Sequence, residues 1–322
     1  MYIDIMLGVK SDMSIIIPVY NRTEYVNSAI KSILGLNSNT YQIEILIISN
    51  IDLLIEVNNE SIRLIKTNLK SLSKKIEIGV KESSSDIIAF LEDDDLWCNN
   101  KINKIFSVLK DNKNIDFYHN EGLQFKNSIN YKNVHIKEVK ETNNIIYKKD
   151  FYNNNSNKLI RLIIKNSLGY NLSSIAVRKN LIINHLDILN SLSVNGIDNL
   201  LLIIALIYGN GIYEDKNIRT FIRIHANNSY KHSNDLIKPI KKINSDIPAI
   251  NKFIKLNYLS TNIIVYCRDI KSKKSIIFKM TLKYIKYCLE LGIMPPLYIL
   301  VESFSRIINV NLYYFILNIY HS

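Results

Sequence analysis

The sequence has few cysteines. Cys98, Cys267 and Cys288 are its only three; they are widely spaced, and no C-x-x-C pair occurs. An odd number of cysteines without such a pair indicates neither a disulfide framework nor a structural zinc site. We therefore expect a reducing, cytoplasmic compartment for this chain.

Long hydrophobic runs are also missing. No stretch of ~18 uncharged apolar residues, the length of a transmembrane helix, occurs. The nearest candidates, Leu291–Val301 and Ile307–Ile319, are short, and Pro295-Pro296 breaks the first. Both fit interfacial or core helices better than membrane spans. Residues 1–12 lack the charged and apolar segments of a signal peptide, so we interpret them as an N-terminal extension.

Glycine is scarce, with nine residues in a chain of 322. Gly35 and Gly79 stand alone, so no Gly-rich phosphate loop lies near the first predicted strand. This absence argues against a nucleotidyltransferase, whose chemistry uses such a loop. The composition, 47% hydrophobic and 22% charged, is otherwise that of a globular protein with a full core.

Positive charge is in excess and unevenly distributed. The net charge is +12, and Lys231–Lys286 carries 13 Lys and Arg against three Asp, a net of +10. A basic excess at one end of a chain indicates an anionic partner there, either a membrane surface or a polyanion. Aromatic and basic residues in Tyr258–Tyr287 alternate too loosely for a nucleic-acid platform, so no nucleic-acid partner is predicted.

The first 230 or so residues alternate strand-like and helix-like segments, which is typical of βαβ units. In the first helix-like segment, Thr23–Leu34, the apolar residues fall on one face and Gly35 follows the last of them. We therefore expect an α/β fold with a mostly parallel sheet flanked by helices. The predicted strands are Ser14–Val19, Ile43–Ile48, Ile62–Ile65 and Ile87–Leu91.

Four consecutive acids, Glu92–Asp95, directly follow the last of these strands. Adjacent carboxylates repel one another, and a divalent cation removes that penalty, so the cluster favours Mg²⁺ or Mn²⁺. In open α/β sheets ligands bind beyond the carboxyl ends of the strands, where Tyr20-Asn21 and Ser49-Asn50 are also expected. The alternative is a solvated helix N-terminus, because Leu96–Leu109 looks helical.

Two motifs resemble those of family 2 glycosyltransferases, which have the GT-A fold. Pro18-Val19-Tyr20-Asn21-Arg22 with Glu24 is similar to the P-x-Y-N segment of that family, and Ile87–Trp97 is similar to its apolar strand and D-x-D motif. The likeness continues to Gly196–Asn199, Arg223–His225 and Asn227–Ser229, and covers roughly residues 13–230. It implies a nucleotide-diphospho-sugar donor and a saccharide or lipid-linked acceptor.

The resemblance also implies which residues form the site. Asp94 would hold Mn²⁺ or Mg²⁺ against the diphosphate, with His225 as a second metal ligand. Asp95 and Trp97 would lie beside the acceptor. The donor itself would be bound by Pro18, Val19, Tyr20, Asn21, Glu24, Asn50, Glu92, Asp93 and Arg223.

Asp198, in Gly196-Ile197-Asp198-Asn199, resembles the Asp that acts as catalytic base in inverting members of the family. Arg223 would neutralise leaving-group charge, and alternation in Phe221–His225 points Arg223 and His225 to one face of a strand. A purely structural role remains open for both Asp198 and His225. Asp198 fits the first turn of the helix that continues as Leu200–Ile207, and His225 fits a structural strand end.

Three departures from the family pattern leave questions open. Ser49-Asn50 stands where an Asp pair usually binds the base, so the donor base is not defined. Lys75–Gly79 keeps only the glycine of an A-R-N-x-G segment, and Ile197 replaces the acid that commonly precedes the catalytic Asp. A catalytically degenerate protein that binds nucleotide sugars or polyanions is therefore the alternative to an enzyme.

We expect a catalytic region at 13–232 and a basic, mainly helical C-terminal region at 233–322. A helix over Ser275–Leu291 would place Lys279, Lys283 and Lys286 opposite an apolar face formed by Ile277, Tyr284, Cys288 and Leu291. Such a helix suits peripheral contact with an anionic membrane, here the inner face of the cell membrane. A helix packed on the catalytic region, with solvated lysines, is the alternative.

Overall fold

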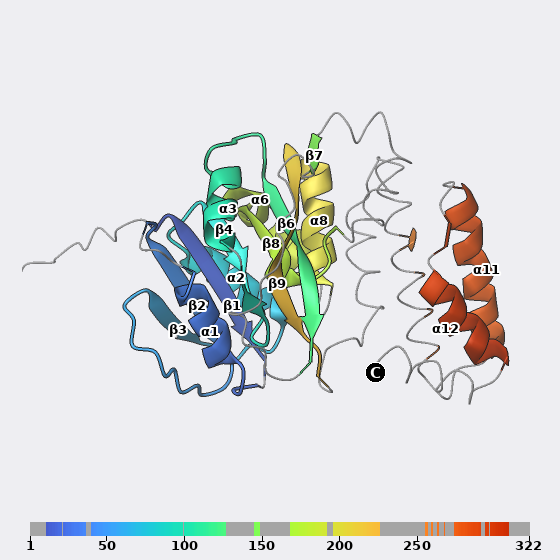
Figure 1. Ribbon diagram of the computed structural model, residues 1–322, viewed down its shortest axis with the longest axis horizontal. Coiled ribbons are helices and arrows are strands. Elements are labelled where there is room, and N and C mark those ends of the chain that lie inside the picture. Colours follow the sequence, from blue (N-terminus) through green and yellow to red (C-terminus); the bar gives the residue numbers. More distant parts are fainter. Residues whose placement is uncertain are drawn as a thin grey trace, which may run out of the picture. The chain divides into compact units, whose positions relative to one another are not determined.

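The computed structural model describes residues 11–20, 22–36, 40–98, 100–126, 145–148, 168–191 and 196–225, and parts of the C-terminal region, chiefly 274–290 and 297–308. The chain divides into two compact units (Figure 1). The first comprises Met1–Asp150 with Ser167–Asn228, and the second comprises Phe151–Asn166 with Ser229–Ser322. Each unit is described separately below.

One half of the sheet in the first unit is parallel. Its strands are arranged in the order β3-β2-β1-β4. Every residue of β1 and β2 is buried, as expected for isoleucine-rich strands covered on both faces. The bounds are β1 Met13–Val19, β2 Ile43–Ser49, β3 Ile62–Lys66 and β4 Ile87–Phe90, which confirms the four predicted strands.

The other half of the sheet is mixed, in the order β8-β6-β9-β5 with β7 also paired to β9. β8 runs antiparallel to both β4 and β6, whereas β6 and β9 are parallel. The mostly parallel character expected from the sequence therefore holds from β3 to β4 and gives way at β8. These strands are β5 Leu96–Trp97, β6 Phe117–Phe125, β7 Ile145–Lys148, β8 Ile175–Arg178 and β9 Gly211–Arg223.

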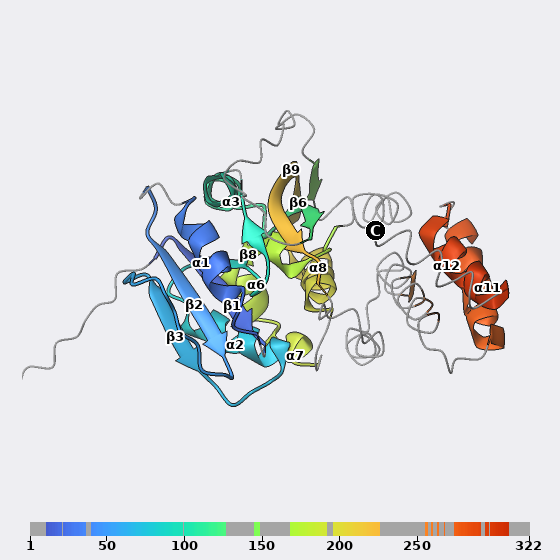
Figure 2. The same ribbon diagram turned by 60° about the horizontal axis from the view of Figure 1, so that its bottom comes forward.

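Helices cover both faces of the sheet (Figure 2). Ile15 and Ile17 of β1 pack in one core with the buried faces of α1 and α3. Ile16 points to the opposite face, where α2 lies so close that a Cβ on Gly79 would come within 2.7 Å of its side chain. The helices are α1 Val26–Leu34, α2 Leu72–Glu82, α3 Lys101–Leu109, α6 Lys179–Ile183, α7 Leu186–Leu189 and α8 Ile197–Tyr208.

The helix predicted for Leu96–Leu109 begins later than expected. Leu96 and Trp97 instead form β5, which pairs with Phe221 and Thr220 of β9. The helix itself starts at Lys101, after Asn100 adopts a left-handed conformation with φ 54°. These two apolar residues form a strand because pairing with β9 buries both of their side chains.

In the second unit, α11 Lys274–Glu290 and α12 Leu297–Ile308 pack against each other. α11 contributes the buried residues Ile277, Thr281, Tyr284 and Cys288. The apolar face that the sequence offered to a membrane is therefore largely internal, while Leu291 lies outside the described residues. Among the helices described here, none is both long and apolar enough to cross a membrane.

Candidate active site

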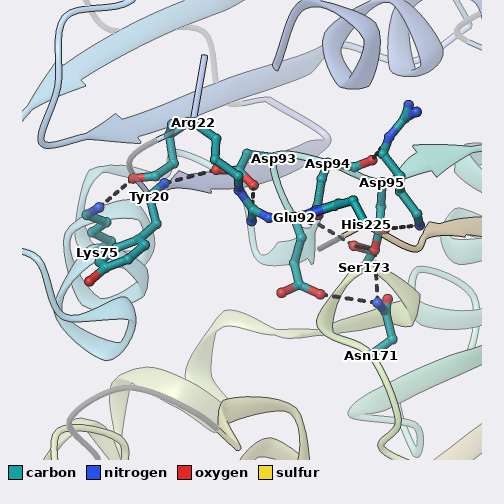
Figure 3. Close-up of polar contacts among 12 residues, drawn as sticks. Tyr20, Arg22, Lys75, Glu92, Asp93, Asp94, Asp95, Asn171, Ser173 and His225 are labelled. Atoms are coloured by element: carbon teal, nitrogen blue, oxygen red, sulfur yellow. Dashed lines mark hydrogen bonds and ion pairs between the residues drawn. The ribbon is translucent and has the colours of Figure 1, made fainter. Parts of the chain in front are cut away.

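The four acids of the cluster occupy the turn that follows β4, at the carboxyl edge of the parallel strands (Figure 3). Asp93, Asp94 and Asp95 are all buried. The end of β1 reaches the same edge, because the backbone N–H of Tyr20 donates to Asp93 Oδ2 at 2.9 Å. The predicted convergence of these two strand ends is thus present, whereas Asn21 lies outside the described residues.

Arg22 is a member of the site to which the sequence assigned no role. Its Nη2 donates to Asp93 Oδ1 and its Nη1 to Asp94 Oδ2, both at 2.7 Å. Burial acts to lower the pKa of Arg22, but Asp93 and Asp94 outweigh it and raise the pKa. The guanidinium therefore supplies positive charge to the acidic turn. Its only sequence signal was its position directly after the P-x-Y-N segment.

Asp94 and His225, the two predicted metal ligands, meet in the structure. Nε2 of His225 lies 2.8 Å from Asp94 Oδ2 and 2.9 Å from Nη1 of Arg22. One carboxylate oxygen and one imidazole nitrogen thus face the same cationic group, which is a donor set that suits a divalent cation. Within the described residues, however, no group of three or more His, Cys, Asp or Glu side chains is placed to hold a metal.

Arg223 contacts the acidic turn through both its backbone and its side chain. Its backbone N–H donates to Asp95 Oδ1 at 2.9 Å and its Nε donates to the carbonyl of Asp94 at 2.8 Å. The guanidinium lies 4.4 Å from the ring centre of Tyr25 and 4.6 Å from that of Phe125. The side chain is buried, and its described contacts place it against the backbone of the turn.

Asp95 is held by three donors. Its Oδ2 accepts hydrogen bonds from Ser173 Oγ at 2.7 Å and from Asn171 Nδ2 at 2.9 Å, and its Oδ1 accepts from the backbone of Arg223. Burial and the neighbouring Asp94 nevertheless raise the pKa of Asp95 to about 7. Burial, together with Asp95 and the other acids, also raises the pKa of Glu92 well above its usual value. Glu92 and Asp95 therefore release their protons at a higher pH than exposed carboxyl groups do.

Asn171 connects the acidic turn to Asp198. Its Nδ2 donates to Glu92 Oε2 at 3.1 Å as well as to Asp95, and its backbone N–H donates to Asp198 Oδ2 at 3.1 Å. Asp198 lies in the first turn of α8, where its Oδ1 accepts from the N–H of Asn199 at 2.9 Å. Burial raises the pKa of Asp198 despite these hydrogen bonds. The structure thus brings the predicted base into the same polar network as Glu92 and Asp95.

The ends of β1 and β2 are joined by Lys75 of α2, a second residue to which the sequence gave no role. Its Nζ donates to the carbonyl of Val19 and, at 2.5 Å, to Asn50 Oδ1. It also lies 5.2 Å from the ring centre of Tyr20. Burial lowers the pKa of Lys75 to about 8, although Asp93 acts in the opposite direction. This corner holds the residues predicted to bind the base.

Other predicted site residues lie at different places. Pro18 is within β1, opposite Ile48 of β2. Glu24 is exposed just before α1, and no hydrogen bond joins it to the acidic turn in the described part of the chain. Trp97, expected beside the acceptor, is completely buried in the core, where its Nε1 donates to the carbonyl of Ser173 at 3.0 Å. We correct that expectation, because β5 formation turns the indole inward.

Comparison with known structures shows the fold. The crystal structure of residues 1–349 of S. aureus TarS in complex with UDP-GlcNAc aligns with a TM-score of 0.52 at 13% identity, covering 92% of this chain and 82% of that one. The longer S. aureus TarS structure aligns with a TM-score of 0.56 at 13% identity, covering 94% of this chain and 54% of that one. The chain therefore has the GT-A fold that the motifs implied. No curated protein matches the sequence.

The fold and the acidic turn at its strand ends are those of a glycosyltransferase. Residues 14–170 match the family model described as Glycosyl transferase family 2, and this span contains the P-x-Y-N segment, the acidic turn and the start of the Asn171 loop. Residues 14–170 thus match glycosyl transferase family 2 over the region in which the motifs predicted that family.

Proposed function

We propose that the chain transfers a sugar, with inversion, from a nucleotide-diphospho-sugar to a hydroxyl of a saccharide or lipid-linked acceptor. The observation that carries this proposal is the link made by Asn171. Its backbone binds Asp198 and its side chain binds Glu92 and Asp95, so the candidate base and the acidic turn belong to one site.

The donor would lie along the carboxyl edge of the sheet. Tyr20, Asn50 and Lys75 form its base end, where Asn50 supplies an amide and Lys75 an ammonium group. Asp52, the nearest acid in sequence, is exposed and paired with Lys66. S. aureus TarS, which shares the fold, was crystallised with UDP and with UDP-GlcNAc. This supports a nucleotide-sugar donor without defining its base.

Asp94 and His225 fit a divalent cation, because their facing lone pairs already share one cationic partner, Arg22. When bound, Mn²⁺ or Mg²⁺ would offset the charge of the donor diphosphate. The chain offers these two ligands, and Mg²⁺-type sites usually take the rest from phosphates and water. Arg22 would then be free to leave Asp94 and meet the same diphosphate, which keeps the local charge balanced.

In the transfer itself, Asp198 would accept the proton of the acceptor hydroxyl as its oxygen bonds to the anomeric carbon. The bond from that carbon to the diphosphate breaks at the same time, and the nucleoside diphosphate leaves with the bonding electrons. The raised pKa of Asp198 makes its carboxylate a stronger proton acceptor. A well-placed general base contributes on the order of 10²–10⁴ in rate. Asp95 would stay beside the acceptor in this arrangement.

Binding measurements test the donor site first. UDP, GDP and dTDP should be titrated by calorimetry with and without Mn²⁺, into the wild type and Asp94→Asn. We expect one nucleotide to bind more tightly with Mn²⁺, and this gain to be lost in the variant. Nuclear magnetic resonance of the product formed from that donor then reports its anomeric configuration. Binding without turnover would instead favour the degenerate protein, and no nucleotide binding at all would exclude the donor site.

We also propose that α11 contacts an anionic membrane. Phe278, Leu282 and Leu289 are exposed by 44%, 48% and 63%, and their spacing places them on one face. The lysine stripe formed by Lys279, Lys283 and Lys286 runs beside that face. This exposed face replaces the buried one that the sequence suggested, and it combines apolar and basic groups as interfacial helices do.

Vesicle sedimentation tests the membrane contact. Vesicles with phosphatidylserine should bind the wild type, and vesicles of phosphatidylcholine alone should bind it less. Leu282→Ser should weaken binding to the anionic vesicles. Ile276→Ser serves as the matched control, because Ile276 is exposed by 40% on the other side of the helix. Equal losses from both variants would count against a membrane-facing stripe.

A further inference from the structure

The side-chain amide of Asn171 has a fixed orientation. Its nitrogen donates to two carboxyl oxygens, Glu92 Oε2 at 3.1 Å and Asp95 Oδ2 at 2.9 Å. Asp95 Oδ2 also accepts from Ser173, so it is an acceptor and must be faced by a donor. Rotating the amide by half a turn would place the oxygen of Asn171 against that acceptor. Oδ1 therefore points away from both acids.

Oδ1 of Asn171 is buried and has no hydrogen-bond partner among the residues that the structure describes. Asn171 as a whole is only 9% exposed. Buried amide oxygens are almost always hydrogen bonded, because leaving one unpaired costs free energy. An acceptor that the protein itself does not satisfy, inside a binding site, is a position prepared for a donor group of a ligand.

The loop that carries Asn171 is held in an uncommon conformation. Asn171 has φ 70°, a left-handed value that asparagine tolerates better than most residues, and Gly169 has φ 76°. The carbonyl of the intervening Tyr170 accepts from Nε2 of His119 at 3.1 Å, while Nδ1 of His119 faces Glu214 Oε2 at 2.8 Å. Burial acts against a charged His119, but Glu214 outweighs it and raises the pKa of the imidazole. The loop is thus anchored from the core.

The surroundings of Oδ1 decide what kind of group it can receive. Glu92, Asp95 and Asp198 all bond to Asn171, so an anionic ligand group at Oδ1 would meet further carboxyl oxygens. A neutral hydroxyl suits the position, because it donates one proton to Oδ1 and brings no further negative charge to the carboxyl groups. Sugars are the ligands in this site that carry several such hydroxyls. In the proposed donor site, the sugar attached to the diphosphate would lie beside the turn that Asn171 contacts.

We propose that Asn171 Oδ1 accepts a hydrogen bond from one ring hydroxyl of the transferred sugar and so helps to select the donor. This inference rests on the proposed function, since it needs a nucleotide-sugar donor in the site. It names a class of substrate: donors with a free hydroxyl at the position that faces Asn171. Donors that are deoxygenated or acylated at that position are selected against.

The experiment is a double-mutant cycle, in which the side chain of Asn171 and single hydroxyls of the donor are removed separately and together. Calorimetry measures binding of the nucleotide, the nucleotide sugar and its monodeoxy analogues to the wild type and to Asn171→Gly. Glycine accepts the positive φ, so the backbone of the loop is retained. We expect one monodeoxy analogue to bind the wild type on the order of tenfold more weakly than the full donor, and this difference to disappear in Asn171→Gly.

Several outcomes would overturn the inference. One is that every monodeoxy donor binds the wild type as tightly as the full donor, a comparison that needs no variant. Another is that the penalty for the missing hydroxyl is unchanged in Asn171→Gly, or that only deoxygenation of the acceptor matters. If the wild type binds nucleotide but gains nothing from any sugar hydroxyl, the donor site stands and this contact does not exist. If it binds no nucleotide, the proposed function fails as well.

Discussion

Nη1 of Arg22 lies 2.9 Å from Nε2 of His225, a residue 203 positions further along the chain, and both contact the same oxygen of Asp94. A cation held by Asp94 and His225 must share or replace this contact. Arg22 supplies positive charge to the acidic turn, and a metal ion held by Asp94 would compete with it for one carboxylate oxygen.

Removing the guanidinium should accordingly strengthen metal binding. In Arg22→Gln we expect Mn²⁺ to bind on the order of tenfold more tightly in the absence of nucleotide, as measured by calorimetry. The variant should also be destabilised by roughly 3 kcal/mol without metal, because a buried ion pair has lost one partner. Arg63→Gln is the control, since Arg63 pairs with Glu82 at the surface. Unchanged Mn²⁺ affinity in Arg22→Gln would show that the metal does not use this oxygen.

Replacing the base should separate catalysis from binding. We expect Asp198→Asn to reduce the rate of sugar transfer on the order of 10²–10⁴, because the acceptor hydroxyl loses its proton acceptor. Donor affinity should change little, since the amide oxygen can still accept from the backbone of Asn171. Asp187→Asn is the matched control, because Asp187 occupies the first turn of α7 and is exposed. If both variants lose equal stability and activity, Asp198 acts only as a helix-start residue.

The buried acids should make stability depend on pH. Burial and neighbouring charges raise the pKa of Asp93 to about 6 and that of Asp95 to about 7, and they also raise the pKa of Glu92. The unfolded chain releases these protons near pH 4, whereas in the folded protein the pKa of Asp93 is about 6 and that of Asp95 about 7. The folded protein therefore binds more protons within this window, and its free energy of unfolding should fall as pH rises through it.

Urea denaturation at several pH values between ~4.5 and ~7.5 measures this slope. Glu92→Gln should flatten it, because a neutral amide replaces one of the acids. Saturating Mn²⁺ should also flatten it by favouring the ionised carboxylates. Glu24→Gln is the control, since Glu24 is exposed at the same end of the sheet. A slope that Glu92→Gln leaves unchanged would mean that Glu92 ionises normally in the folded protein.

Lys75 should matter for binding the nucleobase. Lys75→Met removes the donor to the Val19 carbonyl and to Asn50, and the loss of these hydrogen bonds should cost ~1–3 kcal/mol of stability. We expect the preferred nucleotide to bind on the order of tenfold more weakly, and discrimination among bases to decrease. Lys74→Met, one residue earlier and paired with Glu77 at the surface, should affect neither. Retained discrimination in Lys75→Met would place base recognition elsewhere.

The parallel half of the fold was predictable because its strands are continuous apolar runs. β1, β2 and β4 are buried on both faces, so their sequences needed no partner to be recognised. α2 was missed because its buried face includes Lys75, Ser73 and Gly79 as well as two apolar residues. β5 was assigned to a helix because two residues carry no detectable period, and only their pairing with β9 defines them.

The residues of the candidate site likewise divide into those that the sequence predicted and those that it did not. Asp94, His225 and Asp198 were predicted because the family motifs mark them in the sequence. Arg22 and Lys75 were not, since their importance lies in tertiary hydrogen bonds to residues 72, 71 and 56 positions away. Asn171 lies outside the motifs that mark the site in the sequence, and its unpaired oxygen results from how the side chains pack. A sequence motif identifies residues that it contains, but it does not identify residues whose role arises from long-range contacts in the fold.

The dependence of the acidic turn on β9 has a consequence for synthesis of the chain on the ribosome. Asp95 emerges 128 residues before Arg223, whose backbone N–H is one of its donors, and Asp94 precedes His225 by 131 residues. A nascent chain therefore carries the whole cluster of acids, with Arg22, long before the strand that closes the turn has been translated. The parallel strands can associate early. The active site, in contrast, is completed among the last parts of the first unit, and a chain released before β9 would expose an unfinished, strongly acidic edge.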